Sequence, residues 1–235
     1  MNTLHCGRFL LNLDRPLIMG IVNLTPDSFS GDGLLDDLDQ AIRHARYQLD
    51  SGAAILDIGA ESTRPGAQPA SEQEELARLL PLLEEIRNWP VTISVDTYKP
   101  SVMRAVLKVG ASMINDISGM TNPAALEAVA SSSCAVCVMH MQGEPGWMQR
   151  APSYDDVYAE VRTFLAAAIT RCRSSGVALN RLVVDPGFGF GKTLQHNLSL
   201  FSRLAALSAE QPPVLVGMSR KSMLGTITGQ PVERR

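Results

Sequence analysis

The chain has 235 residues, of which 45% are apolar and 19% charged, so it is long enough to bury one large core. Its formal net charge of -3 provides no broad positive field, which argues against a nucleic-acid-binding protein. No apolar run approaches the roughly 20 residues that cross a bilayer, and the first residues contain no basic segment followed by an apolar stretch. We therefore expect a cytoplasmic protein that binds neither nucleic acid nor membranes.

Short apolar runs alternate with longer amphipathic segments along the whole chain. The runs are residues 17–22, 54–59, 91–96, 112–117, 135–141, 181–186 and 213–218. Each is typical of a strand buried on both faces of a parallel sheet. Helical periodicity separates them, for example at residues 38–52, 71–88, 157–176 and 198–210, and Ser71 followed by Glu74 predicts a capping box. No linker divides the chain, so we predict a single α/β domain over residues 1–235.

Polar residues gather where the predicted strands end. They are Asn23, residues 61–64, Asp96, Asn115, Asp116, His140, Asp185 and residues 219–221. An open doubly wound sheet concentrates ligand groups at one switch point, whereas a (β/α)8 barrel draws them from many strand ends onto one mouth. The pattern therefore favours a TIM-type barrel. Only seven βα units are visible, so we expect a barrel that is incomplete at its C-terminal end, without the eighth strand.

Two sequence patterns that suggest cofactor sites fail on closer inspection. Cys134 and Cys137 form a C-x-x-C inside an apolar run with no second pair, which predicts buried thiols rather than a zinc or redox site. The segment DPGFGFGKT at residues 185–193 has Pro186 where a P-loop needs glycine, and its glycines do not follow the dinucleotide-binding spacing. We interpret it as a loop after the sixth predicted strand.

Hydroxyls and cations occur at two strand ends, in ESTRPG and SRKS. They are Thr63, Arg64, Ser219, Arg220 and Lys221. Such groups hold a phosphate or a carboxylate, although each of them alone is equally typical of a surface cation or a helix cap. As a set they predict an anion site in the mouth.

Asp96, Asn115 and Asp185 follow apolar strands, and we expect them deep in the mouth, where an unpaired carboxylate is costly. A planar heterocycle with an amino group beside a ring N–H would donate two hydrogen bonds to such a carboxylate. Two alternatives remain at this point. One carboxylate pairs with Lys221, or all three residues are structural hydrogen-bonding groups of the strand ends.

The segment NLTPDSFSGDG at residues 23–33 carries oxygen ligands in a turn-rich loop. Asn23, Asp27 and Asp32 suit Mg²⁺, which keeps several waters and takes one or two protein ligands together with substrate phosphates. Turn chemistry alone explains the same acidic and hydroxyl residues. A magnesium site is therefore one of two interpretations of this loop.

Seven blocks, taken together and in order, resemble dihydropteroate synthase. They are MGIVNLTPDSFS, DIGAESTRPGA, SVDT, NDISG, VMHMQGEP, DPGFGFGKT and VGMSRKS, spread over residues 19–222. The resemblance implies a (β/α)8 barrel transferase of folate biosynthesis, a sulfonamide target and possible homodimer. Such an enzyme condenses 6-hydroxymethyl-7,8-dihydropterin diphosphate with 4-aminobenzoate to give 7,8-dihydropteroate and pyrophosphate. The alternatives are a non-catalytic pterin-binding module and a pterin-binding methyltransferase, and the phosphate-holding motifs argue against the methyltransferase.

The resemblance also implies roles for individual residues, with Asp96, Asp185, Lys221 and Arg64 as the catalytic set. It assigns Mg²⁺ to Asn23 and Asp32, and pterin diphosphate to Thr63, Asp96, Asn115, Asp185 and Lys221. It assigns 4-aminobenzoate to Met139, Phe190, Gly217, Ser219 and Arg220, with Phe29 and Pro65 from two loops. The chain departs from the family in two places: the loop acid is displaced by one position, to Asp32, and residue 235 precedes the family's final Arg-x-His.

Overall fold

The main sheet of the computed structural model, which describes residues 3–25, 37–62, 68–209 and 212–235, is parallel and follows the chain order. Its strands are β3 (Met19–Asn23), β4 (Ile55–Gly59), β5 (Thr92–Asp96), β6 (Met113–Asp116), β7 (Ala135–Met139) and β8 (Leu182–Asp185). A strictly sequential order of parallel strands is that of a singly wound barrel, because a doubly wound sheet reverses its order at a switch point. The sheet thus supports the predicted barrel rather than the open alternative.

Residues 213–218, expected to form a seventh strand, continue the sheet but make only one β-bridge. Val214 bridges Val184 in parallel, Val184 N donates to Pro213 O at 2.9 Å, and Leu215 N donates to Val184 O at 2.8 Å. The segment therefore lies beside β8, in the place that the prediction gave it. Among the described residues, no strand pairs with the other edge of β3.

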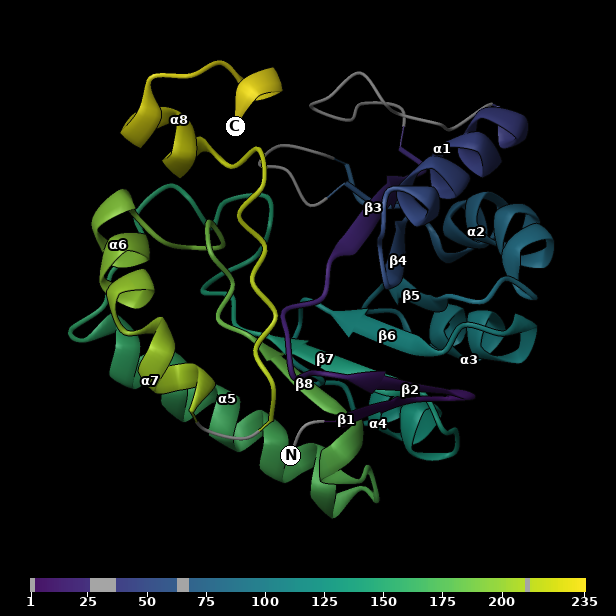
Figure 1. Cartoon of the computed structure of the whole chain (residues 1–235). Coiled ribbons are helices and arrows are strands. Elements are labelled where there is room, and N and C mark those ends of the chain that lie inside the picture. Colours follow the sequence, from purple (N-terminus) through teal and green to yellow (C-terminus); the bar gives the residue numbers. More distant parts are fainter. Residues whose placement is uncertain (1–2, 26–36, 63–67, 210–211) are drawn as a thin grey trace.

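Helices cover the outer face of the curved sheet (Figure 1). They are α1 (Leu38–Asp50), α2 (Glu72–Ile86), α3 (Pro100–Val109), α4 (Pro123–Ala130), α5 (Val157–Ser174), α6 (Leu194–Ser202) and α7 (Leu204–Ser208). The helix α8 (Ser222–Thr228) lies instead at the top of the view, and short 3-10 turns occur at Leu179–Arg181 and Val232–Arg234. The predicted capping box is confirmed, since Glu74 N donates to Ser71 Oγ at 3.2 Å and Ser71 N to Glu74 Oε2 at 2.8 Å. The helix predicted at 198–210 starts earlier and is divided at Arg203.

An N-terminal hairpin, absent from the sequence prediction, closes the lower end of the inner face. Its strands β1 (Thr3–Cys6) and β2 (Phe9–Asn12) are antiparallel. Leu4 and Cys6 pack in one buried cluster with Ile55, Met113 and Val183. These three residues lie in the N-terminal halves of β4, β6 and β8. The hairpin therefore provides apolar cover for the end of the barrel opposite α8 (Figure 1).

All four cysteines are buried and free, which confirms the prediction of core thiols. Burial raises the pKa of Cys6 to about 12 and that of Cys172 to about 11, so these groups stay neutral thiols near pH 7. Within the described ranges, no helix is long and apolar enough to span a membrane.

Candidate functional site

Polar side chains line the inner face of the sheet at the C-terminal ends of the strands, which are its upper end in Figure 1. Asn23 lies beside Gly59 in the register, Gly59 beside Asp96, and Asp96 beside Asn115. A Cβ atom on Gly59 would stand 3.6 Å from Asn23 Oδ1 and 3.7 Å from Asp96 Cβ. The glycine therefore leaves open the space between an amide oxygen and a carboxylate. Asp185 ends β8 next to Met139.

Asp57 belongs to this group, and the sequence analysis missed it. It lies two residues before the end of β4 and is 5% exposed. Asn115 Nδ2 donates to its Oδ2 at 3.1 Å, whereas its buried Oδ1 has no hydrogen-bond partner among the described residues. Burial raises the pKa of Asp57, and the nearby polar side chains of Ser94 and Asn115 oppose that rise. Asp57 thus fixes the orientation of the Asn115 amide.

Asp96 is a desolvated acid of the mouth that lies near other acids. Desolvation holds its pKa well above the usual range, and the negative charges of Asp57 and Asp116 raise it further. A carboxylate in this position gains from N–H donors that a ligand supplies, because donors stabilise its charged form. Perturbed acids in a concave site are candidates for function.

Asp116 does not face the mouth, contrary to its place among the predicted strand-end residues. Since Asn115 points inward, the next residue of β6 points outward. Asp116 accepts hydrogen bonds from the backbone N–H groups of Ser118 at 2.7 Å and Met120 at 2.8 Å. Its role is to close the turn that follows β6.

Lys221 and Asp185 form the charged side of the mouth. Lys221 Nζ donates to the carbonyl oxygen of Phe188 and lies 4.7 Å from the centre of the Phe190 ring. Burial lowers the pKa of Lys221, and the charge of Asp185 opposes this. Burial also raises the pKa of Asp185, which Lys221 and the hydrogen bond from Gly187 N at 2.7 Å oppose. The charges of Lys221 and Asp185 thus oppose the effect of burial on each other, and the pairing of Lys221 with one of the acids stays a prediction.

The residues expected around an aminobenzoate lie close to Lys221. A Cβ atom on Gly217 would be 3.7 Å from Lys221 Nζ. Ser219 and Arg220 are exposed and immediately precede Lys221 in the chain. Met139 is buried at the end of β7, beside Asp185 in the register. Six predicted residues lie outside the described ranges: Asp27, Phe29, Asp32, Thr63, Arg64 and Pro65.

Glu61, another strand-end residue, is engaged in an ion-pair network beside the mouth. Lys99 Nζ forms a close ion pair with Glu61 and a second one with Glu75 Oε2 at 2.6 Å. Tyr98 Oη donates to Glu61 Oε1 at 2.9 Å, and Glu75 is 1% exposed. The network joins the ends of β4 and β5 to α2, so it anchors the chain just before residue 63.

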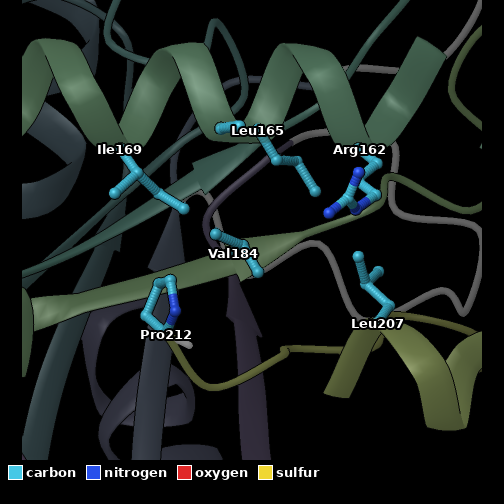
Figure 2. A pocket seen from close by; sticks show the side chains of 7 residues that line it. Arg162, Leu165, Ile169, Val184, Leu207 and Pro212 are labelled. Carbon is cyan, nitrogen blue, oxygen red and sulfur yellow. The ribbon is translucent and has the colours of Figure 1, made fainter. Parts of the chain in front are cut away.

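A cavity of about 170 Å³ lies on the opposite, outer face of the sheet, between α5, β8 and α7 (Figure 2). Arg162, Leu165, Ala166, Ile169, Val184, Leu207 and Pro212 line it. Val184 points outward into this cavity, whereas its neighbour Asp185 points inward, because successive strand residues alternate faces. None of the predicted site residues lines it, so this cavity is separate from the mouth.

Comparison with known proteins gives a consistent result. The family described as pterin binding enzyme matches residues 19–235. The chain is 52% identical to dihydropteroate synthase of Escherichia coli K12 over 218 residues, which are 92% of this chain and 77% of that protein. It is 48% identical to the Neisseria meningitidis serogroup C enzyme over 230 residues, covering 96% and 81% of the two chains.

Solved structures agree with these relatives. Dihydropteroate synthase of Yersinia pestis, solved as a sulfonamide drug complex, superposes with a TM-score of 0.94 at 48% identity, covering 99% of this chain and 85% of that one. The Burkholderia cenocepacia enzyme, complexed with 7,8-dihydropteroate, gives 0.87 at 49% identity, covering 99% and 82%. The chain therefore belongs to the pterin binding enzyme family, among its dihydropteroate synthases, and has the α/β barrel fold of that group.

Proposed function

We propose that the mouth formed by Asp96, Asn115, Asp185 and Lys221 binds 6-hydroxymethyl-7,8-dihydropterin diphosphate and joins its pterin to 4-aminobenzoate. The single observation that carries this assignment is the placement of the acids Asp96 and Asp185, with Asn115, at the carboxyl ends of strands on one inner face of the sheet. A pterin edge carries an amino group beside ring N–H groups, which are the donors that such carboxylates lack. Family membership provides the reaction class, transfer of a pterinylmethyl group.

Each residue of the pterin pocket receives a defined task. Asp96 and Asp185 accept hydrogen bonds from the pterin N–H groups. Asn115, held by Asp57 at 3.1 Å, presents its remaining amide atoms in a fixed direction. Lys221, poised above Phe188 and Phe190, contributes positive charge toward the diphosphate.

The bond changes need no covalent nucleophile. The bond between the exocyclic carbon of the pterin and the diphosphate oxygen breaks, and the amine nitrogen of 4-aminobenzoate forms the new C–N bond and then loses a proton to solvent. An arylamine is neutral at pH 7, so no strong general base is required. We expect dissociative character, in which the ring held by Asp96 and Asp185 stabilises positive charge on the exocyclic carbon as diphosphate departs.

Asn23 and Asp32 would hold a Mg²⁺ ion in this scheme. The open space beside Asn23 Oδ1, which a side chain at residue 59 would fill, and the chemistry of an amide oxygen both fit this cation. When bound, Mg²⁺ neutralises charge on the departing diphosphate. Arg64 and Thr63, predicted from the same motif as Glu61, would contact that group from the neighbouring strand end.

The 4-aminobenzoate subsite is proposed at Met139, Phe190, Gly217, Ser219 and Arg220, with Phe29 and Pro65. Phe190 offers a flat apolar contact for the benzoate ring, and the exposed Ser219 and Arg220 offer donors for its carboxylate. A Xanthomonas albilineans relative, with a TM-score of 0.90 and 45% identity, was solved with 4-aminobenzoic acid. A cytoplasmic location and a homodimer remain predictions, to be checked by cell fractionation and light scattering.

A pyrophosphate-release assay tests this function. We expect release only when pterin diphosphate, 4-aminobenzoate and Mg²⁺ are all present, and we expect chelation with EDTA to stop it. Asp96→Asn serves as the matched variant, since it keeps the size of the side chain and removes its charge. Pterin binding without pyrophosphate release would instead favour a non-catalytic pterin-binding module.

A further inference from the structure

Lys192 is a buried lysine to which the proposed reaction assigns no role. It follows the glycine-rich loop and is 3% exposed. Its Nζ lies 2.9 Å from the Gly187 carbonyl oxygen, 3.0 Å from the Phe190 carbonyl oxygen and 2.9 Å from His140 Nδ1. Burial lowers the pKa of Lys192 to about 7, and the three N–H donors of its protonated form match these three partners. A buried charge without such partners would be costly.

His140 acts as the acceptor in this arrangement. Burial and the charge of Lys192 lower the pKa of His140 to about 3, which keeps the imidazole neutral and Nδ1 able to accept a hydrogen bond. The ring is fixed by an edge contact with Phe164, at 5.0 Å between centroids. The acceptor of Lys192 is therefore held by the β7–α5 connection.

The loop between Asp185 and Lys192 packs directly on that connection. A Cβ atom on Gly187 would come within 1.9 Å of His140 O, and one on Gly191 within 2.3 Å of Gln142 O, and both glycines have positive φ. Only glycine permits this close backbone approach together with the left-handed conformation. Lys192 therefore acts as the side-chain link across two backbone segments that are already in contact.

The other side of the same loop contacts Lys221. Phe188 O accepts from Lys221 Nζ, the Phe190 ring centre lies 4.7 Å from that atom, and a Cβ on Gly189 would be 3.2 Å from Lys221 Cδ. Residues 187–190 thus lie between two lysines. One lysine holds their backbone from within the core, and the other meets their carbonyl and ring in the mouth.

We propose that Lys192 is a positioning residue for the 4-aminobenzoate side of the site. By tying Gly187 and Phe190 to His140, it holds the Phe190 ring and the Phe188 carbonyl where they meet Lys221 and the benzoate ring. The inference rests on the proposed function, because it assigns Phe190 to that substrate. Asp96 and Asn115 lie on other strands and do not contact this loop, whereas Asp185 and Lys221 contact it through Gly187 and Phe188, so we expect a smaller effect on pterin than on the benzoate.

Two ligands separate the two halves of the site in a binding test by calorimetry. The first is 6-hydroxymethylpterin, which occupies only the pterin pocket, and the second is 7,8-dihydropteroate, which also carries the benzoate. For Lys192→Met, which keeps the length of the side chain and removes its donors, we expect dihydropteroate affinity to fall at least about tenfold. We expect pterin affinity to change by less than about threefold, and the KM for 4-aminobenzoate to rise. Lys108→Met, at an exposed lysine of α3, is the control and should bind both ligands as the wild type does.

A matched pair of variants at His140 tests the contact between Lys192 Nζ and His140 Nδ1 without changing the lysine. This pair tests the inference if Lys192→Met fails to fold. Asn and Leu are similar in size, but only Asn retains an acceptor near the position of Nδ1. We expect His140→Leu to lose dihydropteroate affinity and His140→Asn to recover most of it. Equal affinities in the two His140 variants, or an equal loss of both ligands in Lys192→Met, would overturn the inference. A wild-type protein that binds neither ligand would overturn the proposed function, and this inference with it.

Discussion

The two ends of the inner face of the sheet have opposite effects on the stability of the folded protein. At the lower end, Ile55, Met113 and Val183 are buried beneath Leu4 and Cys6 of the hairpin. At the upper end, β4, β5 and β8 carry Asp57, Asp96 and Asp185, whose pKa values burial raises, and repulsion from neighbouring acids adds to the rise at Asp96 and Asp185. The lower end lowers the free energy of the folded state, whereas the upper end raises it until a ligand supplies the missing donors.

This contrast shows how one sheet accommodates a costly site. Strand residues two apart share a face, so Ile55, Asp57 and Gly59 place an apolar contact, an acid and an open space in one line along β4. The apolar cover at one end offsets the desolvated carboxylates at the other. Variants at the two ends should therefore separate activity from stability.

The largest effect is expected at the upper end, from Asp96→Asn. Loss of the carboxylate should lower kcat/KM by about 10²- to 10³-fold, because a stabilising interaction made in the transition state is removed. The unfolding midpoint of the free variant should equal or exceed that of the wild type, since a desolvated charge is removed as well. Steady-state kinetics and thermal unfolding measure the two quantities. Near wild-type turnover would exclude an electrostatic role for Asp96.

At the lower end, Leu4→Ala should show the reverse behaviour. Leu4 is 3% exposed, and truncating a buried leucine costs about 2–5 kcal/mol in the free energy of unfolding. The kcat/KM of the folded variant should stay within about twofold of wild type, because Leu4 packs in the lower cluster, away from the mouth. Urea denaturation gives the first value and kinetics at low temperature the second. As a control, Leu10→Ala changes a leucine that is 66% exposed on the same hairpin.

The pH dependence of the two properties should differ in sign. The raised pKa of Asp96 means that, between its unfolded and folded pKa values, the folded protein binds more protons than the unfolded chain. The contribution of Asp96 to stability therefore decreases as the pH rises through its folded pKa. The midpoint of Asp96→Asn relative to wild type should thus increase with pH, while pterin affinity of the wild type falls as the pH is lowered and Asp96 becomes protonated.

Thermal unfolding over a series of pH values measures the difference in midpoint between Asp96→Asn and wild type. Calorimetric titration over the same series measures the pterin affinity of the wild type. Asp50→Asn, at an exposed carboxylate that ends α1, is the matched control. A constant difference between Asp96→Asn and wild type across the series would contradict the assigned cause.

The smallest effect is expected on the helical shell, outside both ends. Ser71→Ala removes the side-chain cap of α2 and should cost about 1 kcal/mol, whereas Ser71→Gly should cost only a few tenths. Denaturant unfolding of the two variants measures the difference. No loss of stability in Ser71→Ala would mean that the hydrogen bond from Glu74 N to Ser71 Oγ contributes nothing to stability.

The strands and the mouth could be predicted because their signal is local. A buried parallel strand is a continuous apolar run, and the polar residue that ends it reaches the mouth, as Asp96 and Asp185 do. Asp57 was missed because it lies inside such a run, although its spacing from Gly59 places it on the inner face. Asp116 was wrongly expected in the mouth. It does end a strand, but the alternation of side chains along β6 turns it to the opposite face.

The remaining features depend on contacts between distant residues. The short, mixed runs of β1 and β2 carry little strand signal, and the hairpin is stabilised by burial against β6 and β8, far along the chain. The sequence suggests a role for Lys192 only through a P-loop pattern, and Pro186 excludes that pattern. Its partner His140 is separated from it by the whole of α5, so only the folded chain brings the two together.

The hairpin also constrains the order in which the chain folds. Gly7 N donates to Ser133 O at 3.0 Å, and Arg8 reaches the carbonyl oxygens of Arg87 and Trp89 at 2.7 and 3.0 Å. A chain synthesised from its N-terminus therefore exposes Leu4 and Cys6 until residues as far along as Ser133 have left the ribosome. Such long-range closure is slow. We expect the first residues made to be among the last to dock, and the floor of the barrel to be completed after the strands that it closes.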